Sequence, residues 1–129
     1  MIVSFDFSGT LDKHPELVIV AKKLKAKGST IYMLSGVNDQ DGIDRRLLFI
    51  KANDLEFDDL IFTSGDTDMK DGKLGCVQKA EACNRLKIDF HYDNSRKVQE
   101  AILKFAPNTS CVLVGRKFVN VKEIIKEIS

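Results

Sequence analysis

The sequence predicts an α/β protein with a three-layer, Rossmann-like fold, in which helices cover both faces of a five-stranded, mostly parallel sheet. Two observations predict this fold. Short β-rich runs alternate with stretches of helical periodicity along the chain, and such alternation indicates right-handed crossovers between parallel strands. The 129 residues, 43% hydrophobic and 30% charged, also have the balance of one globular domain spanning residues 1–129.

Five elements are expected in the first half of the chain. In order, they are a strand at 2–7, a helix at 15–27, a strand at 30–34, a helix ending near 52 and a strand at 60–63. Pro15 suits the first turn of its helix, and Gly28 suits the position just beyond the end. Ile43, Leu47 and Ile50 recur at helical spacing and mark the apolar face of the second helix.

Five further elements are expected in the second half. They are a helix at 74–86, a strand at 88–92, a helix at 96–105, a strand at 110–114 and a final helix. The final helix is predicted from an apolar stripe at i, i+3, i+4 and i+7, formed by Val121, Ile124, Ile125 and Ile128. His91, inside the fourth strand, is expected to be a packed or hydrogen-bonded core residue.

Composition excludes several classes of protein. The net charge is only +1, which argues against a strong sequence-independent grip on nucleic acid. Three cysteines, an odd number, do not suit a disulfide framework and favour a reducing, cytoplasmic location. Asp6 interrupts the apolar start of the chain, so no signal peptide is expected, and no apolar run approaches the roughly 20 residues that span a membrane.

Two acidic residues follow strands of the predicted sheet. Asp6 ends the first strand within FDFSGTLD, where Gly9 permits a sharp turn and Thr10 adds a hydroxyl. Asp93 ends the fourth strand, and ligands of parallel sheets bind at this carboxyl edge. Two converging carboxylates repel unless a cation lies between them, and oxygen ligands suit Mg²⁺. A strand-end Asp that only caps a turn is the structural alternative.

Two weaker signals lie at the same edge. Ser35 and Gly36 follow the second strand and can offer a hydroxyl and a backbone N–H to an anion, although Ser-Gly is also common turn material. Lys79, on the helix before Asp93, can neutralise a bound phosphate and the Asp6 carboxylate. Together these residues predict a phosphate site beside a metal site.

These motifs resemble those of the haloacid dehalogenase-like (HAD) superfamily. Its first motif, DxDGT, is matched except at the third position, and the other three motifs follow in order up to about residue 103. The matches are Asp6-Phe7-Ser8-Gly9-Thr10, Leu34-Ser35-Gly36, Lys79 and Asp93-Asn94. The stretch KAEACNRLKIDFHYDNS is similar to the segment that joins the third and fourth motifs in small members.

The resemblance implies a Mg²⁺-dependent phosphohydrolase or phosphotransferase. Asp6 would attack phosphorus and carry an aspartyl-phosphate, with Lys79 as the second catalytic residue. Mg²⁺ would be held by Asp6, Asp93 and the Ser8 backbone carbonyl, with Asn94 nearby or acting through water. The phosphoryl group would be bound by Thr10, Ser35, Gly36 and Lys79. Lys73, further upstream, is the alternative site lysine.

The chain departs from the family pattern at Ser8. The family's phosphatases have a second Asp there, which protonates the leaving oxygen and then activates water. A serine hydroxyl is too weak an acid for this step, and losing a general acid typically slows a reaction by about 10²–10⁴-fold. P-type ATPases, whose DKTGT also has a hydroxyl residue there, keep a persistent aspartyl-phosphate. A slow enzyme, a degenerate member serving as a binding or protein-interaction module, and a different hydrolysis such as dehalogenation all stay open.

No cap domain is expected over the site. Relatives insert a cap after the first motif or between the second and third, but here Asp12 runs almost directly into a helix, and one helix, one strand and one loop fill residues 36–78. The resemblance therefore implies a small, capless member that takes a phosphorylated substrate, with room for a bulky or macromolecular one. A small metabolite would be poorly shielded from water unless oligomerisation or the loop Gly65–Gly75 covers the site.

Overall fold

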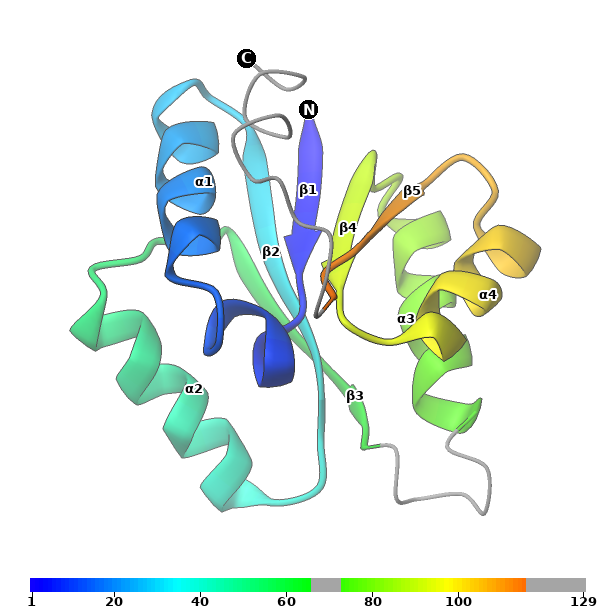
Figure 1. Ribbon diagram of the computed structural model, residues 1–129, viewed down its shortest axis with the longest axis horizontal. Coiled ribbons are helices and arrows are strands. Elements are labelled where there is room, and N and C mark those ends of the chain that lie inside the picture. Colours follow the sequence, from blue (N-terminus) through cyan, green and yellow to red (C-terminus); the bar gives the residue numbers. More distant parts are fainter. Residues whose placement is uncertain (66–72, 116–129) are drawn as a thin grey trace.

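The computed structural model describes residues 1–65 and 73–115 and confirms the predicted fold class (Figure 1). Five strands form one all-parallel sheet in the order β3-β2-β1-β4-β5. The strands are β1 (Ile2–Phe5), β2 (Thr30–Val37), β3 (Asp59–Ser64), β4 (Phe90–Asp93) and β5 (Ser110–Leu113). The helices are α1 (Pro15–Ala26), α2 (Gln40–Ala52), α3 (Lys73–Arg85) and α4 (Arg96–Phe105), and the short turn η1 (Phe7–Leu11) follows β1.

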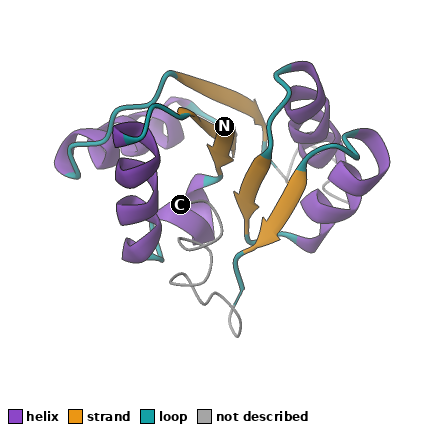
Figure 2. Cartoon of the chain, turned by 90° about the horizontal axis from the view of Figure 1, so that it is seen from above, coloured by secondary structure: helices purple, strands orange, loops and turns teal. Residues whose placement is uncertain are grey.

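The helices form the two outer layers. Figures 1 and 2 show α1 and α2 on one face of the sheet and α3 and α4 on the other. Two apolar clusters fill the space between the layers. The first joins β1 and β2 to α1 and includes Val3, Phe5, Leu17, Ala21 and Met33. The second joins α3 and α4 and includes Ala80, Cys83, Ile88, Val98 and Ile102. Such burial supplies the main drive for folding.

The strand register brings the end of β1 beside the end of β4. Phe5 pairs with Tyr92 in the parallel ladder, and the next backbone amide, that of Asp6, donates to the Tyr92 carbonyl at 2.8 Å. Asp6 therefore leaves the sheet at the same level as Asp93. This register gives the two predicted acidic residues a common location.

The structure refines several predicted boundaries. The first strand ends at Phe5 and not at residue 7, because the chain turns at Asp6 into η1. β2 extends to Val37, since it pairs with β3 as far as Ser64. The predicted final helix, with its stripe Val121, Ile124, Ile125 and Ile128, lies outside the described residues. In the part of the chain that the structure describes, no helix is long and apolar enough to cross a membrane.

The predicted apolar face of α2 is wrong at Leu47, which is 46% exposed. The face that packs inward carries Gly42 and Arg46 instead, and Arg46 is only 4% exposed. The physical reason is that α2 packs on the polar carboxyl end of the sheet: Arg46 stacks on the Phe7 ring at 4.7 Å, and Phe49 meets the same ring edge-on. Burial there does not require an apolar side chain.

Candidate active site

A cavity of about 300 Å³ opens where β1, β2 and β4 end. Its lining combines carboxylates, hydroxyls, an amide and one ammonium group, contributed by Asp6, Ser8, Gly9, Gly36, Lys79, Asp93, Asn94 and Ser95. Most of these side chains come from the segments that the sequence motifs singled out. The cavity lies at the carboxyl edge of the sheet, where ligands of open parallel sheets bind.

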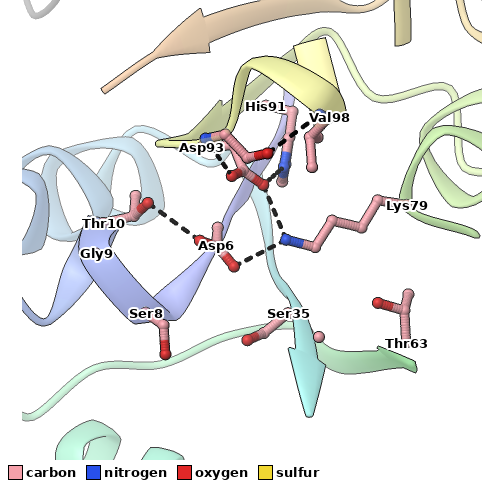
Figure 3. A network of polar contacts seen from close by, with 12 residues as sticks. Asp6, Ser8, Gly9, Thr10, Ser35, Thr63, Lys79, His91, Asp93 and Val98 are labelled. Atoms are coloured by element: carbon pink, nitrogen blue, oxygen red, sulfur yellow. Dashed lines mark hydrogen bonds and ion pairs between the residues drawn. The ribbon is translucent and has the colours of Figure 1, made fainter. Parts of the chain in front are cut away.

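Lys79 joins the two carboxylates across this cavity (Figure 3). Its Nζ donates to Asp6 Oδ1 at 3.0 Å and to Asp93 Oδ2 at 2.9 Å, and all three side chains are buried. Lys79 lies on α3, whereas Asp6 follows β1 and Asp93 ends β4. Three distant parts of the sequence therefore meet in one charged cluster. Lys79 is thus the site lysine in the structure, whereas the side chain of Lys73 lies outside the description.

The buried charges shift one another's pKa values. Burial raises the pKa of Asp6 above its ordinary 3.8, and the nearby Asp93 charge adds to this, while Lys79 opposes it. Burial also acts on Asp93, but the Lys79 ammonium and the hydrogen bond from His91 outweigh it and lower the pKa of Asp93 to about 2. Burial by itself lowers the pKa of Lys79, yet the two carboxylates raise it overall. Lys79 is therefore charged at neutral pH.

His91 supports Asp93 from behind. Its Nε2 donates to Asp93 Oδ2 at 2.9 Å, because a carboxylate can only accept, and Nδ1 forms a 2.6 Å hydrogen bond with the Ser4 hydroxyl. The Ser95 amide donates to Asp93 Oδ1 at 3.0 Å. The predicted core role of His91 is confirmed, but its partner was missed. The signal was the spacing of two, which places His91 and Asp93 on the same face of β4.

Thr10 and Ser35 lie behind the cavity lining. Thr10 is fully buried and donates its hydroxyl to Asp6 Oδ2 at 3.2 Å, so it holds the carboxylate. Ser35 is also fully buried, and its Oγ accepts a hydrogen bond from Arg46 Nε at 2.9 Å. Gly36 lines the cavity itself, and a Cβ there would lie 2.9 Å from the Ser64 carbonyl oxygen. This position therefore has little room for a side chain.

Arg46 is a site residue that the sequence did not reveal. Its guanidinium donates to Ser35 Oγ, to the backbone carbonyls of Gly42 and Gly36, and at 3.4 Å to Ser8 Oγ. Burial lowers the pKa of Arg46, and the nearby Asp6 charge opposes this lowering. The guanidinium stays protonated throughout the ordinary pH range. No motif marks an arginine 11 residues after Ser35, and only the packing of α2 brings it against Ser8 and Gly36, which line the cavity.

Asp6, Asp93, Asn94 and the Ser8 backbone offer oxygen donors that fit Mg²⁺. All four residues line the same cavity, and each carboxylate keeps one oxygen that Lys79 does not use. Hard oxygen donors are the ligands that Mg²⁺ prefers. Among residues 1–65 and 73–115, no group of three His, Cys, Asp or Glu side chains forms a metal cage. Such a site would rely on two carboxylates completed by an amide, a carbonyl and water.

The turn that holds Ser8 requires a glycine. Ser8 has φ −64° and ψ 122° and Gly9 has φ 75° and ψ 0°, which are type II turn values. A Cβ at Gly9 would overlap the side-chain amide of Asn94. The turn and the Asn94 amide are therefore packed against each other at the mouth of the site.

Gly9→Ala is expected to lower the free energy of unfolding by about 1 kcal/mol through backbone strain and to displace the Asn94 side chain. Gly28→Ala is the matched control, because Gly28 has φ +87° with open space around it. Urea denaturation should show similar losses for both variants, while only Gly9→Ala shifts the Asn94 side-chain amide signal in ¹⁵N-edited NMR. An unmoved signal in Gly9→Ala would contradict the described packing.

The thiols of Cys83 and Cys111 do not offer a competing nucleophile. None of the three cysteines forms a disulfide, and Cys76 and Cys83 are buried in the α3–α4 core. Burial raises the pKa of Cys83 and of Cys111 to about 12, so both stay protonated at neutral pH.

Comparison with known proteins shows similarity of fold. No family model matches the sequence, and no curated protein matches it. Two structures of the Pnkp1/Rnl/Hen1 RNA repair complex align over 88% of this chain with TM-scores of 0.65 and 0.67, each at 18% identity. The chain spans less than half of those proteins, 42% and 45% of their length. An uncharacterized protein from Corynebacterium glutamicum aligns over 97% of this chain and 92% of its own, with TM-score 0.59 and 15% identity. At these identities the likeness establishes an α/β fold that also occurs in an RNA repair complex.

Proposed function

We propose that this chain is a HAD-type, Mg²⁺-dependent phosphohydrolase or phosphotransferase that works through an aspartyl-phosphate on Asp6. The observation that carries the proposal is the buried Asp6–Lys79–Asp93 cluster in a cavity at the carboxyl edge of the sheet. The motif resemblance supports it, as does the likeness to chains of an RNA repair complex.

In the proposed first step, an Asp6 carboxylate oxygen forms a bond to phosphorus while the bond to the ester oxygen breaks. Thr10 and Lys79, which donate to the two Asp6 oxygens, hold the carboxylate in position, and the Lys79 ammonium also stabilises negative charge on the transferring group. Water then attacks the aspartyl-phosphate, which releases inorganic phosphate and restores Asp6. Mg²⁺, when bound by Asp6, Asp93, Asn94 and the Ser8 carbonyl, would supply further charge neutralisation.

Ser8 determines how fast this cycle runs. It lines the cavity where the family's phosphatases have an acid, and its hydroxyl protonates a leaving oxygen poorly. The departing oxygen must then take its proton from water. We therefore infer a slow enzyme, or one that favours substrates with good leaving groups.

The proposed substrate is the phosphorylated part of a large molecule. No cap was predicted over the site, and the described residues of β1, β2 and β4 leave the cavity open at their ends. The likeness to an RNA repair complex favours a macromolecular substrate or partner. The net charge of +1 favours recognition of a phosphorylated end over a strong grip along a polyanion.

Turnover of an aryl phosphate with and without Mg²⁺ tests the proposed function, and Ser8→Asp sharpens the test. We expect weak, Mg²⁺-dependent hydrolysis by the wild type and a gain of about 10²-fold in Ser8→Asp, the lower end of what a general acid contributes. The gain is limited because Arg46 Nη2, 3.4 Å from Ser8 Oγ, would hold the new carboxylate ionised.

A binding or protein-interaction module is the second candidate, and Ser8 is the observation that favours it. A domain without the acid can keep the cavity for recognition alone. Absence of turnover in wild type and Ser8→Asp, together with no Mg²⁺ binding by calorimetry, would contradict the enzyme and support the module.

A further inference from the structure

Arg46 is a buried cation that forms no direct ion pair with a carboxylate within the described residues, although the charges of Asp6, Asp12 and Asp39 act on it from further away. Within residues 1–65 and 73–115, the acceptors of its hydrogen bonds are neutral: two backbone carbonyls and the hydroxyls of Ser8 and Ser35. The Arg46 residue is only 4% exposed, and its guanidinium carbon lies 4.7 Å from the centre of the Phe7 ring. A buried guanidinium without a direct ion-pair partner is incompletely compensated, so this arrangement suits a site that receives an anion.

The hydrogen bonds of Arg46 also fix how two hydroxyls can act. A guanidinium only donates, so Ser35 Oγ and Ser8 Oγ are both acceptors toward it. Each hydroxyl therefore keeps its own proton for another acceptor. In the view of Figure 3 both serine side chains lie below Asp6. One planar fork, anchored on the Gly36 and Gly42 carbonyls, thus holds two O–H donors beside the cavity.

We propose that Arg46 is a positioning residue that aims the Ser8 and Ser35 hydroxyls at a dianionic phosphoryl group and supplies the charge that favours the dianion. This inference rests on the proposed function and adds the residue that selects the charge state of the ligand. It assigns to α2, which carries none of the predicted motifs, a role in phosphate recognition.

Binding of inorganic phosphate in the presence of Mg²⁺, measured by calorimetry at pH 8, tests the proposal. Arg46→Gln should weaken binding about tenfold or more, the effect of losing a charge-assisted contact. Arg45→Gln removes the same charge from the next residue, which is exposed, and should leave affinity unchanged. Arg46→Lys keeps the charge but cannot span two hydroxyls and two carbonyls, so we expect an intermediate loss.

A double-mutant cycle separates positioning from a structural role. Ser35→Ala should weaken phosphate binding about tenfold in the wild type but less than about twofold in Arg46→Gln, because the hydroxyl is then no longer held. Affinity in the wild type should fall as the pH drops through the second pKa of phosphate, and this fall should be shallower in Arg46→Gln. Thermal unfolding confirms that each variant is folded at the assay temperature.

Four outcomes overturn the proposal. If the wild type binds phosphate and both Arg46 variants bind it equally well, Arg46 has no such role, while the proposed function stands. If the losses from Ser35→Ala and Arg46→Gln simply add, Arg46 does not act through Ser35. If the wild type neither binds phosphate nor hydrolyses the aryl phosphate, the proposed function fails as well. If Arg46→Gln does not fold, the phosphate affinities of Arg46→Lys and Ser35→Ala test the proposal instead. Wild-type affinity in both variants would then overturn it.

Discussion

Asp6→Asn is expected to reduce turnover of an aryl phosphate by about 10⁴-fold or more, because it removes the attacking oxygen and leaves the rest of the cavity in place. The Asn amide oxygen can still accept the hydrogen bond from Lys79 that Asp6 Oδ1 accepts at 3.0 Å. The variant should therefore stay folded, with Lys79 still paired to Asp93. Initial rates with Mg²⁺, compared at equal folded fraction, measure the loss.

Acid-quenched labelling connects this loss to the intermediate. Wild type incubated with a ³²P-labelled phosphate donor should carry acid-stable, alkali-labile label, and Asp6→Asn should carry none. Asp12→Asn is a matched control, because Asp12 lies nearby on the same turn but uses its carboxylate to accept the Gly9 amide. Turnover in Asp6→Asn above about one hundredth of wild type would place the nucleophile elsewhere.

Lys79→Met is expected to lower the free energy of unfolding at neutral pH by about 3 kcal/mol or more, the effect of breaking a buried ion pair from one side. Asp6 and Asp93 both accept a hydrogen bond from this lysine in an ion pair, and they are 5% and 1% exposed. Without the ammonium, two buried carboxylates face each other uncompensated. Guanidinium denaturation gives the difference, and phosphoryl transfer should be lost as well.

The pH dependence of this difference has a definite sign. In the wild type the pKa of Asp93, about 2, is below its ordinary 3.8, so its stabilising contribution is present above about pH 4 and lost as the pH falls toward 2. In Lys79→Met, burial and mutual repulsion raise the pKa of both carboxyls, so their destabilising charge disappears on mild acidification. The difference in the free energy of unfolding between Lys79→Met and wild type should therefore shrink as the pH is lowered from about 8 to about 4.

Lys73→Met is the control for Lys79→Met, since Lys73 is the other lysine compatible with the motif order. It should leave both stability and turnover close to wild type. A Lys79→Met protein as stable as wild type at neutral pH, with no convergence at lower pH, would contradict the described ion pairs. A large loss of turnover in Lys73→Met alone would move the site lysine to that position.

The order of the helices and strands could be predicted from hydrophobic periodicity and from the residues that begin and end helices. Alternation of β-rich and amphipathic segments predicted a mostly parallel sheet, and Pro15 and Gly28 mark the two ends of α1 by local rules of helix termination. The ends of β1, before Asp6, and of β2, at Val37, were harder to predict from the sequence. They depend on where the backbone finds hydrogen-bond partners on neighbouring strands, and those partners are distant in the sequence.

Some features of the candidate site could likewise be predicted from the sequence, and others required the structure. Asp6, Asp93 and Lys79 carry their own signals, because strand-end acids and a helical lysine stand at positions defined by local pattern. The role of Thr10 as a donor to Asp6 and that of His91 as a donor to Asp93 required the fold, since each depends on rotamers and packing around a buried carboxylate. Whether these residues perform phosphoryl transfer is the prediction that the experiments above address.

Local chemistry along the chain thus determined the fold class, the sheet edge and the two acidic residues that meet there, because strand ends and helical stripes are properties of short segments. Three-dimensional packing alone decided that α2 turns Arg46 inward in place of Leu47. The reason is physical: a guanidinium is buried at low cost where acceptors meet its N–H groups, and residues from β2, η1 and the first turn of α2 supply these carbonyls and hydroxyls together.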